Sequence, residues 1–152
     1  MGQRGEFKGH YKVGITDGKI MGAQFQLYKN AGWNSDCSPD ITTTTMIHLD
    51  ASYEFPTFDV NGETCITNTA SNTAFRAYGA PPAMTITENM LFDACVEIGL
   101  DPVDFRRANL QKPGYESHFG QIMDESDVTM GECMEEVIKN ITSLSKKVRS
   151  LI

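Results

Sequence analysis

The sequence lacks any long apolar segment. Its purely apolar runs are two or three residues long, too short to span a bilayer, and its first residues hold no apolar core of a signal peptide. Basic residues are also scarce, with 13 Lys and Arg against 20 Asp and Glu, which gives a net charge of −7. An acidic chain has few positive charges with which to bind the phosphates of nucleic acid or anionic lipid. We therefore expect a cytoplasmic protein with no membrane or nucleic-acid partner.

Paired cysteine motifs and phosphate-binding glycine motifs are missing as well. The four cysteines stand far apart and form no C-x-x-C pair, which argues against a zinc site. We expect all four to be reduced and mostly buried. Neither G-x-G-x-x-G nor G-x-x-x-x-G-K-S/T occurs, and neither does a G-x-S-x-G or H-E-x-x-H motif. The three histidines are scattered, so we assign them structural or solvated roles.

The residues that are present predict one domain of the α+β class. The chain has 152 residues, of which 40% are hydrophobic and 22% charged, as in ordinary globular domains. Alternating apolar residues on both sides of Asp17-Gly18 predict an N-terminal β-hairpin whose second strand includes Met21, Phe25 and Leu27. The polar stretch 30–40 predicts a loop, and residues 58–67 predict a further strand.

Helical patterns dominate the second half. One apolar face, with Gly99 as its C-terminal cap, predicts a helix that starts near Pro81; the face comprises Ile86, Met90, Leu91, Ala94, Cys95 and Ile98. Asp101 and Pro102 predict the N-cap and first residue of another helix, whose Phe105, Ala108 and Leu110 face inward. Residues 111–125 are expected to be irregular. A last amphipathic helix should start about Val128, present Met130, Cys133, Met134 and Val137 on one face, and fray at its basic end.

Residues 67–82 form the segment whose residue types point most clearly to a site. Long loops in compact domains are usually functional or disordered, and this one is too aromatic for disorder. On an extended backbone Arg76 and Tyr78 would project to the same side and could line a pocket, with backbone amides as donors to an anionic cofactor. In the alternative interpretation, Arg76 pairs with a surface carboxylate while Phe75 and Tyr78 fill the core. The residues alone favour this alternative.

A family resemblance changes that balance. Residues 71–79, Ser-Asn-Thr-Ala-Phe-Arg-Ala-Tyr-Gly, resemble the S-N-T-A-F-R-G-F/Y-G segment of the molybdenum hydroxylases, the xanthine dehydrogenase and aldehyde oxidase family. Further segments resemble other motifs of that family in the same order: residues 4–14 its G-R-H-P-F-x-x-x-Y-K-V-G, residues 28–32 its Y-S-N-A-G, residues 48–53 its H-M-D-N-x-Y, residues 101–109 its D-P-x-x-x-R-x-x-N and residues 118–121 its H-F-N-Q. The segment 40–51, which its four threonines leave ambiguous, is expected to be helical on this ground.

The resemblance implies that residues 1–137 are part of the first molybdopterin-binding domain of a larger enzyme, with residues 138–152 unmatched. It implies that the backbone at Arg76 approaches the molybdenum centre, and that Tyr78 replaces a phenylalanine that stacks on the substrate. It implies no catalytic residue in this chain, because the G-x-G-E segment that carries the family's general base does not occur here. The 2Fe-2S and FAD modules of such enzymes are missing too, so we expect the chain alone to be inactive. Its partners would be the remainder of the parent polypeptide and a small aromatic or aldehyde substrate. The parent would be a homodimer.

Thr44 marks a departure from the xanthine dehydrogenases. These enzymes carry, at the position of Thr44, an arginine that hydrogen-bonds the purine, and a threonine hydroxyl cannot make that charged contact. The resemblance therefore implies hydroxylation of aldehydes or N-heterocycles, with an aldehyde-oxidase-like preference over purines. The alternative hypothesis is a truncated, non-catalytic remnant that acts as a binding or interaction domain.

Overall fold

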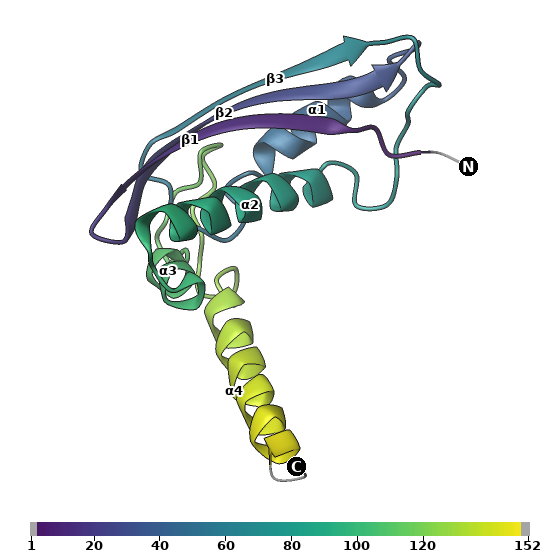
Figure 1. Ribbon diagram of the computed structural model, residues 1–152. Coiled ribbons are helices and arrows are strands. Elements are labelled where there is room, and N and C mark those ends of the chain that lie inside the picture. Colours follow the sequence, from purple (N-terminus) through teal and green to yellow (C-terminus); the bar gives the residue numbers. More distant parts are fainter. Residues whose placement is uncertain (1–2, 150–152) are drawn as a thin grey trace.

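The computed structural model describes the backbone of residues 3–149 and the side chains of residues 3–142. Its elements follow the order β1 (Phe7–Thr16), β2 (Lys19–Gly32), α1 (Ser38–Ile47), β3 (Phe58–Ile66), α2 (Ala80–Ile98), α3 (Pro102–Asn109) and α4 (Met130–Arg149). The predicted α+β class is confirmed. Helices α1 and α2 lie on the same side of a three-stranded sheet, and α4 projects away from the rest (Figure 1).

Strands β1 and β2 form the predicted hairpin. Thr16 pairs with Lys19, so Asp17 and Gly18 make a two-residue turn in which both have positive φ angles, 49° and 73°. Such turns match the twist of the strands that they connect. Because the signal for this turn is local in the sequence, it could be read without knowledge of the rest of the fold.

Strand β2 contains one extra residue, Met21, opposite β1. Ile15 pairs with Ile20 and Gly14 pairs with Gly22, which leaves Met21 without a partner in the ladder. A bulge of this kind shifts the alternation of side chains by one position. Met21 belongs to the second strand, as predicted, but is 51% exposed, whereas Phe25 is fully buried.

Strand β3 pairs with β2 in parallel, and the connection between them contains α1. The expected loop at residues 30–40 is therefore too long: β2 continues to Gly32, and α1 begins at Ser38. Gly32 has a φ of +79°, and a Cβ atom there would lie 2.2 Å from the carbonyl oxygen of Ala70. The end of β2 thus packs directly against the segment that follows β3.

Helix α1 confirms the expected helix in spite of its four threonines. Each threonine hydroxyl donates to the carbonyl oxygen four residues earlier, with O···O distances of 2.8–3.1 Å. These bonds keep the β-branched side chains within the helical backbone pattern. The hydroxyl protons of all four threonines are therefore satisfied within α1.

The hydrophobic core lies between the sheet and the two helices beneath it. Its fully buried side chains come mainly from β2 and α2, and include Phe25, Leu27, Met90, Leu91 and Cys95. The predicted inner face of α2 is correct except at Ile98, the last residue of the helix, which is 45% exposed. Gly99 ends α2 in the left-handed conformation, as predicted.

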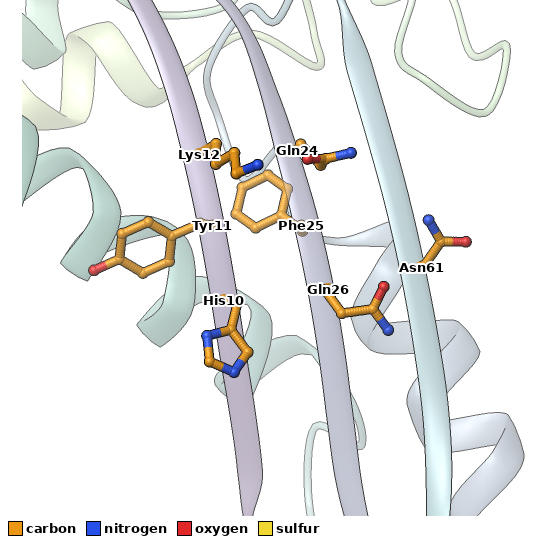
Figure 2. A pocket seen from close by; sticks show the side chains of 7 residues that line it. All are labelled: His10, Tyr11, Lys12, Gln24, Phe25, Gln26 and Asn61. Atoms are coloured by element: carbon orange, nitrogen blue, oxygen red, sulfur yellow. The ribbon is translucent and has the colours of Figure 1, made fainter.

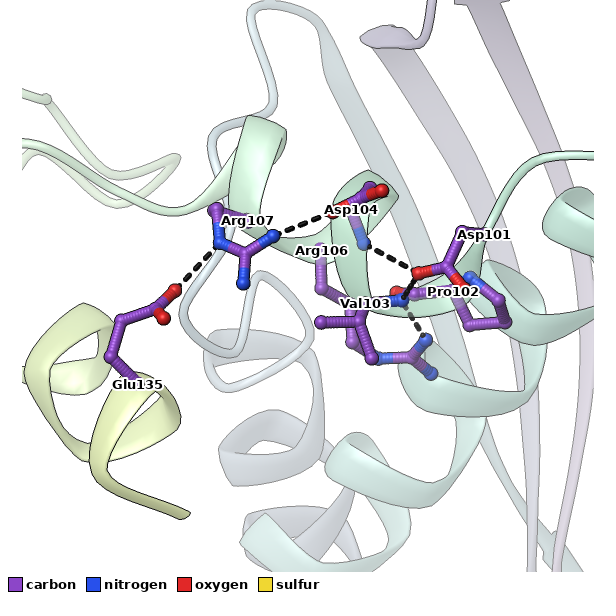
Figure 3. A network of polar contacts seen from close by, with 7 residues as sticks. All are labelled: Asp101, Pro102, Val103, Asp104, Arg106, Arg107 and Glu135. Atoms are coloured by element: carbon purple, nitrogen blue, oxygen red, sulfur yellow. Dashed lines mark hydrogen bonds and ion pairs between the residues drawn. The ribbon is translucent and has the colours of Figure 1, made fainter. Parts of the chain in front are cut away.

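Helix α3 begins as the sequence predicts. The Asp101 carboxylate accepts hydrogen bonds from the amides of Val103 and Asp104, at 2.8 and 3.0 Å (Figure 3). Phe105 is buried, while Ala108 and Leu110 are only partly covered. Arg107 bridges Asp104 and Glu135 of α4, so one ion-pair network joins α3 to the projecting helix (Figure 3).

Helix α4 begins at Met130, close to the expected start about Val128. Its backbone is helical to Arg149 where fraying was expected, and its predicted apolar face is largely exposed. Residues 150–152 lie outside the described part of the chain, and the boundary after residue 137 stays a prediction. Residues 111–125 contain neither helix nor strand, as predicted, and no described helix has the length and apolar character that a membrane crossing requires.

Candidate functional site

The loop between β3 and α2 is held at its base by Asn72. This side chain is 7% exposed, and its Nδ2 donates to the carbonyl oxygen of Asn30 at 3.0 Å. Its backbone amide donates to Ala31 at 2.9 Å, and the next amide, that of Thr73, donates to Gln3 at 3.1 Å. The loop therefore rests between the end of β2 and the N-terminal segment.

Beyond Asn72 the loop turns sharply instead of remaining extended. Ala77 and Tyr78 have φ angles of 67° and 53°, a left-handed conformation that costs a non-glycine residue about 1–2 kcal/mol. The expected same-side projection of Arg76 and Tyr78 is therefore wrong, because it assumed an extended backbone. Gly79 then contacts α1 so closely that a Cβ atom would lie 2.5 Å from the amide nitrogen of Thr45.

Arg4 spans this turn. Its Nη1 donates to the carbonyl oxygen of Tyr78 and its Nη2 to that of Arg76, both at 2.6 Å. The guanidinium carbon also lies 5.3 Å from the centroid of the Phe75 ring. Sequence reasoning missed Arg4, because its partners are backbone carbonyls more than 70 residues away along the chain.

Tyr78 lies half-buried between the loop and the start of α1. Partial burial, then the thiol of Cys37 and the carboxylate of Asp40, raise the pKa of its hydroxyl. The phenol therefore stays protonated at neutral pH. Arg76 is exposed and pairs with no carboxylate among the described residues, and Phe75 is 53% exposed. The alternative in which the loop plugs the core thus fails for Phe75 and Arg76.

Thr44 lies on α1, one turn after Asp40. It is half-buried, and its hydroxyl donates to the carbonyl oxygen of Asp40 at 2.8 Å. Its proton is thereby used within the helix, so toward a ligand the Thr44 oxygen is an acceptor. The Thr44 carbonyl in turn lies 2.8 Å from Nδ1 of His48. The three predicted site residues, Arg76, Tyr78 and Thr44, are thus carried by one loop and the helix that it touches.

Lys29, beneath this loop, is a further residue that sequence reasoning missed. It is fully buried, and its Nζ donates to Ser38 Oγ at 3.0 Å and to the carbonyl oxygen of Asn30 at 3.4 Å. Burial lowers the pKa of its ammonium group. Because lysine is rarely buried without a carboxylate partner, its position in a strand gave no sign of this environment.

A hollow of about 400 Å³ lies elsewhere, on the side of the sheet opposite α1 and α2. Figure 2 shows polar side chains from all three strands around it, including His10, Lys12, Gln24, Gln26 and Asn61. It is shallow and shares no residue with the loop. We therefore assign the candidate site to the loop and not to this hollow.

His118 is a structural histidine, in line with the expectation for the histidines. Its ring stacks on Phe58 with 4.2 Å between centroids, and its Nδ1 lies 3.5 Å from a buried carboxylate oxygen of Asp50. Among the described residues, no cluster of three or more histidine, cysteine or acidic side chains could hold a metal ion. The cysteines are all unpaired, but Cys95 alone is buried and Cys133 is exposed, so the expectation of mostly buried thiols is wrong.

Comparison with known families decides what this loop belongs to. The family model described as "Molybdopterin cofactor-binding domain" matches residues 1–110. The chain belongs to this family. The match includes β1 to α3 and therefore every residue of the candidate site.

Relatives of this molybdopterin-binding chain are much longer proteins. It is 40% identical over 128 residues to a xanthine dehydrogenase of Oryza sativa subsp. japonica, a match that covers 84% of this chain and 9% of the relative. It is 38% identical over 125 residues to the nicotinate hydroxylase hnxS of Emericella nidulans, covering 82% of this chain and again 9% of the relative. The chain thus spans about a tenth of the length of these curated relatives.

Solved structures agree on the fold. The aldehyde oxidoreductase from Desulfovibrio gigas superposes with a TM-score of 0.85 at 23% identity, over 98% of this chain and 16% of that one. Quinoline 2-oxidoreductase from Pseudomonas putida 86 gives 0.74 at 16% identity, over 97% and 20%. At these identities the likeness shows the fold of the molybdopterin-binding domain alone.

The loop of this molybdopterin-binding domain fits an oxygen-rich, anionic group. Among the described residues, the amides of residues 74–77 donate no hydrogen bond, whereas those of Thr73 and Tyr78 do. Residues 74–77 are exposed, and their four consecutive N–H groups are not engaged by the described chain, as a group that binds an anion requires. The exposed Arg76 adds a positive charge at the same place.

Proposed function

We propose that this chain supplies part of the molybdenum-cofactor and substrate site of a molybdenum hydroxylase that acts on aldehydes or N-heterocycles, with aldehydes preferred over purines. The observation that carries the proposal is the turn at residues 74–78, which combines free backbone amides, an exposed arginine and a tyrosine ring at its rim. When bound, the cofactor would supply the redox centre for hydroxylation of the substrate. The remaining roles fall to residues of the chain itself.

Backbone amides 74–77 would hold the cofactor's oxygen atoms, with Arg76 alongside. Tyr78 would present its ring to a planar substrate, a contact worth about 1 kcal/mol that orients the substrate rather than reacting with it. Thr44 would accept a hydrogen bond from the substrate, because its own proton is bound to Asp40. No carboxylate of the described chain takes the role of general base, which we assign to a segment of the parent outside these residues.

The proposal extends to the parent protein. The relatives span about ten times the length of this chain, and we infer a parent that also carries 2Fe-2S and FAD modules, forms a homodimer and functions in the cytoplasm. We infer that the isolated chain does not turn over substrate. Molybdenum analysis of the purified parent tests the cofactor assignment: a polypeptide that holds neither molybdenum nor pterin would instead support the non-catalytic remnant.

Thr44→Arg tests the substrate preference. In the parent enzyme, restoring a cation at this position should raise kcat/KM for hypoxanthine by about ten- to a hundredfold, the range of one charge-assisted hydrogen bond, with little change for an aldehyde. Thr43→Arg is the matched control, because Thr43 also bonds back to its helix but is exposed. Hypoxanthine turnover by the unmodified enzyme at the rate of aldehyde turnover would contradict the preference.

A further inference from the structure

The turn at residues 75–79 holds two residues in an unfavourable backbone conformation, and the hydrogen bonds within the turn do not account for this. Ala77 and Tyr78 are both left-handed, although neither is a glycine. Within the turn, two backbone bonds close it: the Tyr78 amide donates to Phe75 at 2.8 Å and the Ala80 amide to Ala77 at 3.0 Å. Strained non-glycine residues persist only where the surroundings fix them.

Arg4 is the group that fixes this turn from outside. Its two Nη atoms bind the carbonyl oxygens on either side of Ala77, those of Arg76 and Tyr78, both at 2.6 Å. A planar guanidinium fork holds two acceptors at a fixed separation, which a single ammonium group cannot do. The Phe75 ring stacks against the same fork at 5.3 Å, and the neighbouring Gln3 carbonyl accepts from Thr73 at 3.1 Å.

We propose that Arg4 is a positioning residue: by clamping the carbonyls of Arg76 and Tyr78, it holds amides 74–77 outward and sets the orientation of the Tyr78 ring. Gly5 allows this approach, because a Cβ atom there would lie 2.4 Å from the carbonyl oxygen of Asn30. The role in orienting cofactor and substrate rests on the proposed function. The clamp itself does not, and it can be measured in the chain without cofactor.

Trypsin reports on the clamp directly. The Arg76–Ala77 bond is a tryptic site, and its carbonyl is one of the two that Arg4 binds. Cleavage needs the turn to open. In the 152-residue chain, Arg4→Ala should therefore raise the rate of cleavage at this bond, followed by mass spectrometry, by about tenfold or more, the factor that one charge-assisted hydrogen bond represents. Hydrogen exchange at the Tyr78 amide should accelerate in parallel.

Two further measurements separate a clamp from general stabilisation. Guanidinium ion at non-denaturing concentration should slow hydrogen exchange at the Tyr78 amide of the Arg4→Ala chain, whereas methylammonium should not. Tryptic cleavage of Arg4→Lys at Arg76 should remain nearly as fast as that of Arg4→Ala. The matched control is Arg107→Ala. It removes an α3 arginine that pairs with Asp104 and with Glu135 of α4, and it should leave cleavage at Arg76 unchanged.

The urea midpoint of each chain completes the test. The proposal expects the Arg4 variants to lose protection at the turn with little change in the midpoint. Unchanged cleavage in Arg4→Ala, rescue by methylammonium as well as by guanidinium, or a fall in midpoint that accounts for the faster cleavage would each overturn it. A clamp confirmed in a chain whose parent binds no molybdenum would overturn the proposed function and leave the clamp standing.

Discussion

At the scale of single residues, the buried ammonium of Lys29 is the most unusual group below the site. Its hydrogen-bond acceptors are the Ser38 hydroxyl and the Asn30 carbonyl, both neutral. Burial lowers its pKa from 10.5, and the interaction with Cys37 offsets only part of this shift. Hydrogen bonds to neutral groups return only part of the cost of removing a charge from water. Lys29 therefore holds Ser38 in place at the start of α1, but burial of its charge lowers the free energy of unfolding.

That cost makes stability depend on pH. Between the lowered pKa and 10.5 the unfolded chain binds a proton that the folded chain does not, so the free energy of unfolding rises with pH in this window. Lys29→Met removes this dependence. The unmodified chain should gain stability relative to Lys29→Met as pH rises toward 10.5, by up to about 1.4 kcal/mol per pH unit, as measured by urea unfolding.

Lys139→Met is the control for this series, because Lys139 is exposed on α4 and pairs with Glu136 at the surface. The free energy of unfolding of Lys139→Met should change with pH in the same way as that of the unmodified chain over this range. A constant difference between the unmodified chain and Lys29→Met throughout the window would show that Lys29 keeps the same charge in both states.

At the scale of elements, Asn109 ties the hairpin turn to α3. Its Oδ1 accepts from the amide of Ile20 at 2.8 Å, and its Nδ2 donates to the carbonyls of Gly18 at 2.9 Å and Phe105 at 2.8 Å. The side chain is 3% exposed, so water cannot replace these bonds. The final Asn of the D-P-x-x-x-R-x-x-N segment is thus a structural connector.

Asn109→Ala should lower the free energy of unfolding by about 2–4 kcal/mol, because it leaves buried backbone groups of β2 and the turn unpaired. Urea unfolding measures this. Asn89→Ala, at an exposed position of α2, should change stability by no more than about 0.5 kcal/mol. Equal effects of the two substitutions would mean that the turn and α3 are not coupled through Asn109.

The elements that sequence patterns predicted are those specified by neighbouring residues. The Asp17-Gly18 turn, the Asp101 cap and the Gly99 cap each depend on a few adjacent positions, and all three are confirmed. Parallel pairing of β3 with β2 and the bulge at Met21 depend on contacts between distant segments, which a local pattern does not contain.

The same distinction holds for the candidate site. The loop was found because its composition is unusual and its motif resembles a known family. The clamp by Arg4 was not, because its partners are backbone carbonyls, and a carbonyl acceptor has no signature in the side-chain sequence. The geometry of Arg76 and Tyr78 depended on the left-handed angles at Ala77 and Tyr78, which residue type alone would not suggest.

At the scale of the whole molecule, apolar side chains remain exposed on the outer surfaces of the helices. On α2, Phe92 and Val96 are one turn apart and 53% and 67% exposed; on α4, Val137 and Ile141 are 56% and 61% exposed. Apolar side chains grouped on one helix face commonly mark a contact surface. The relatives, about ten times longer, contain other segments that could cover such faces.

In the isolated chain these faces should drive self-association. Sedimentation velocity should show a weight-average mass that rises with concentration, and the double substitution Phe92→Ser/Val96→Ser should weaken this rise, because it removes about 2–4 kcal/mol of apolar contact per chain. Met21→Ser is the matched control, since Met21 is equally exposed but isolated on the hairpin bulge. A chain that stays monomeric at every concentration, or a double variant that associates as strongly as the original, would show that α2 is not the face that needs a partner.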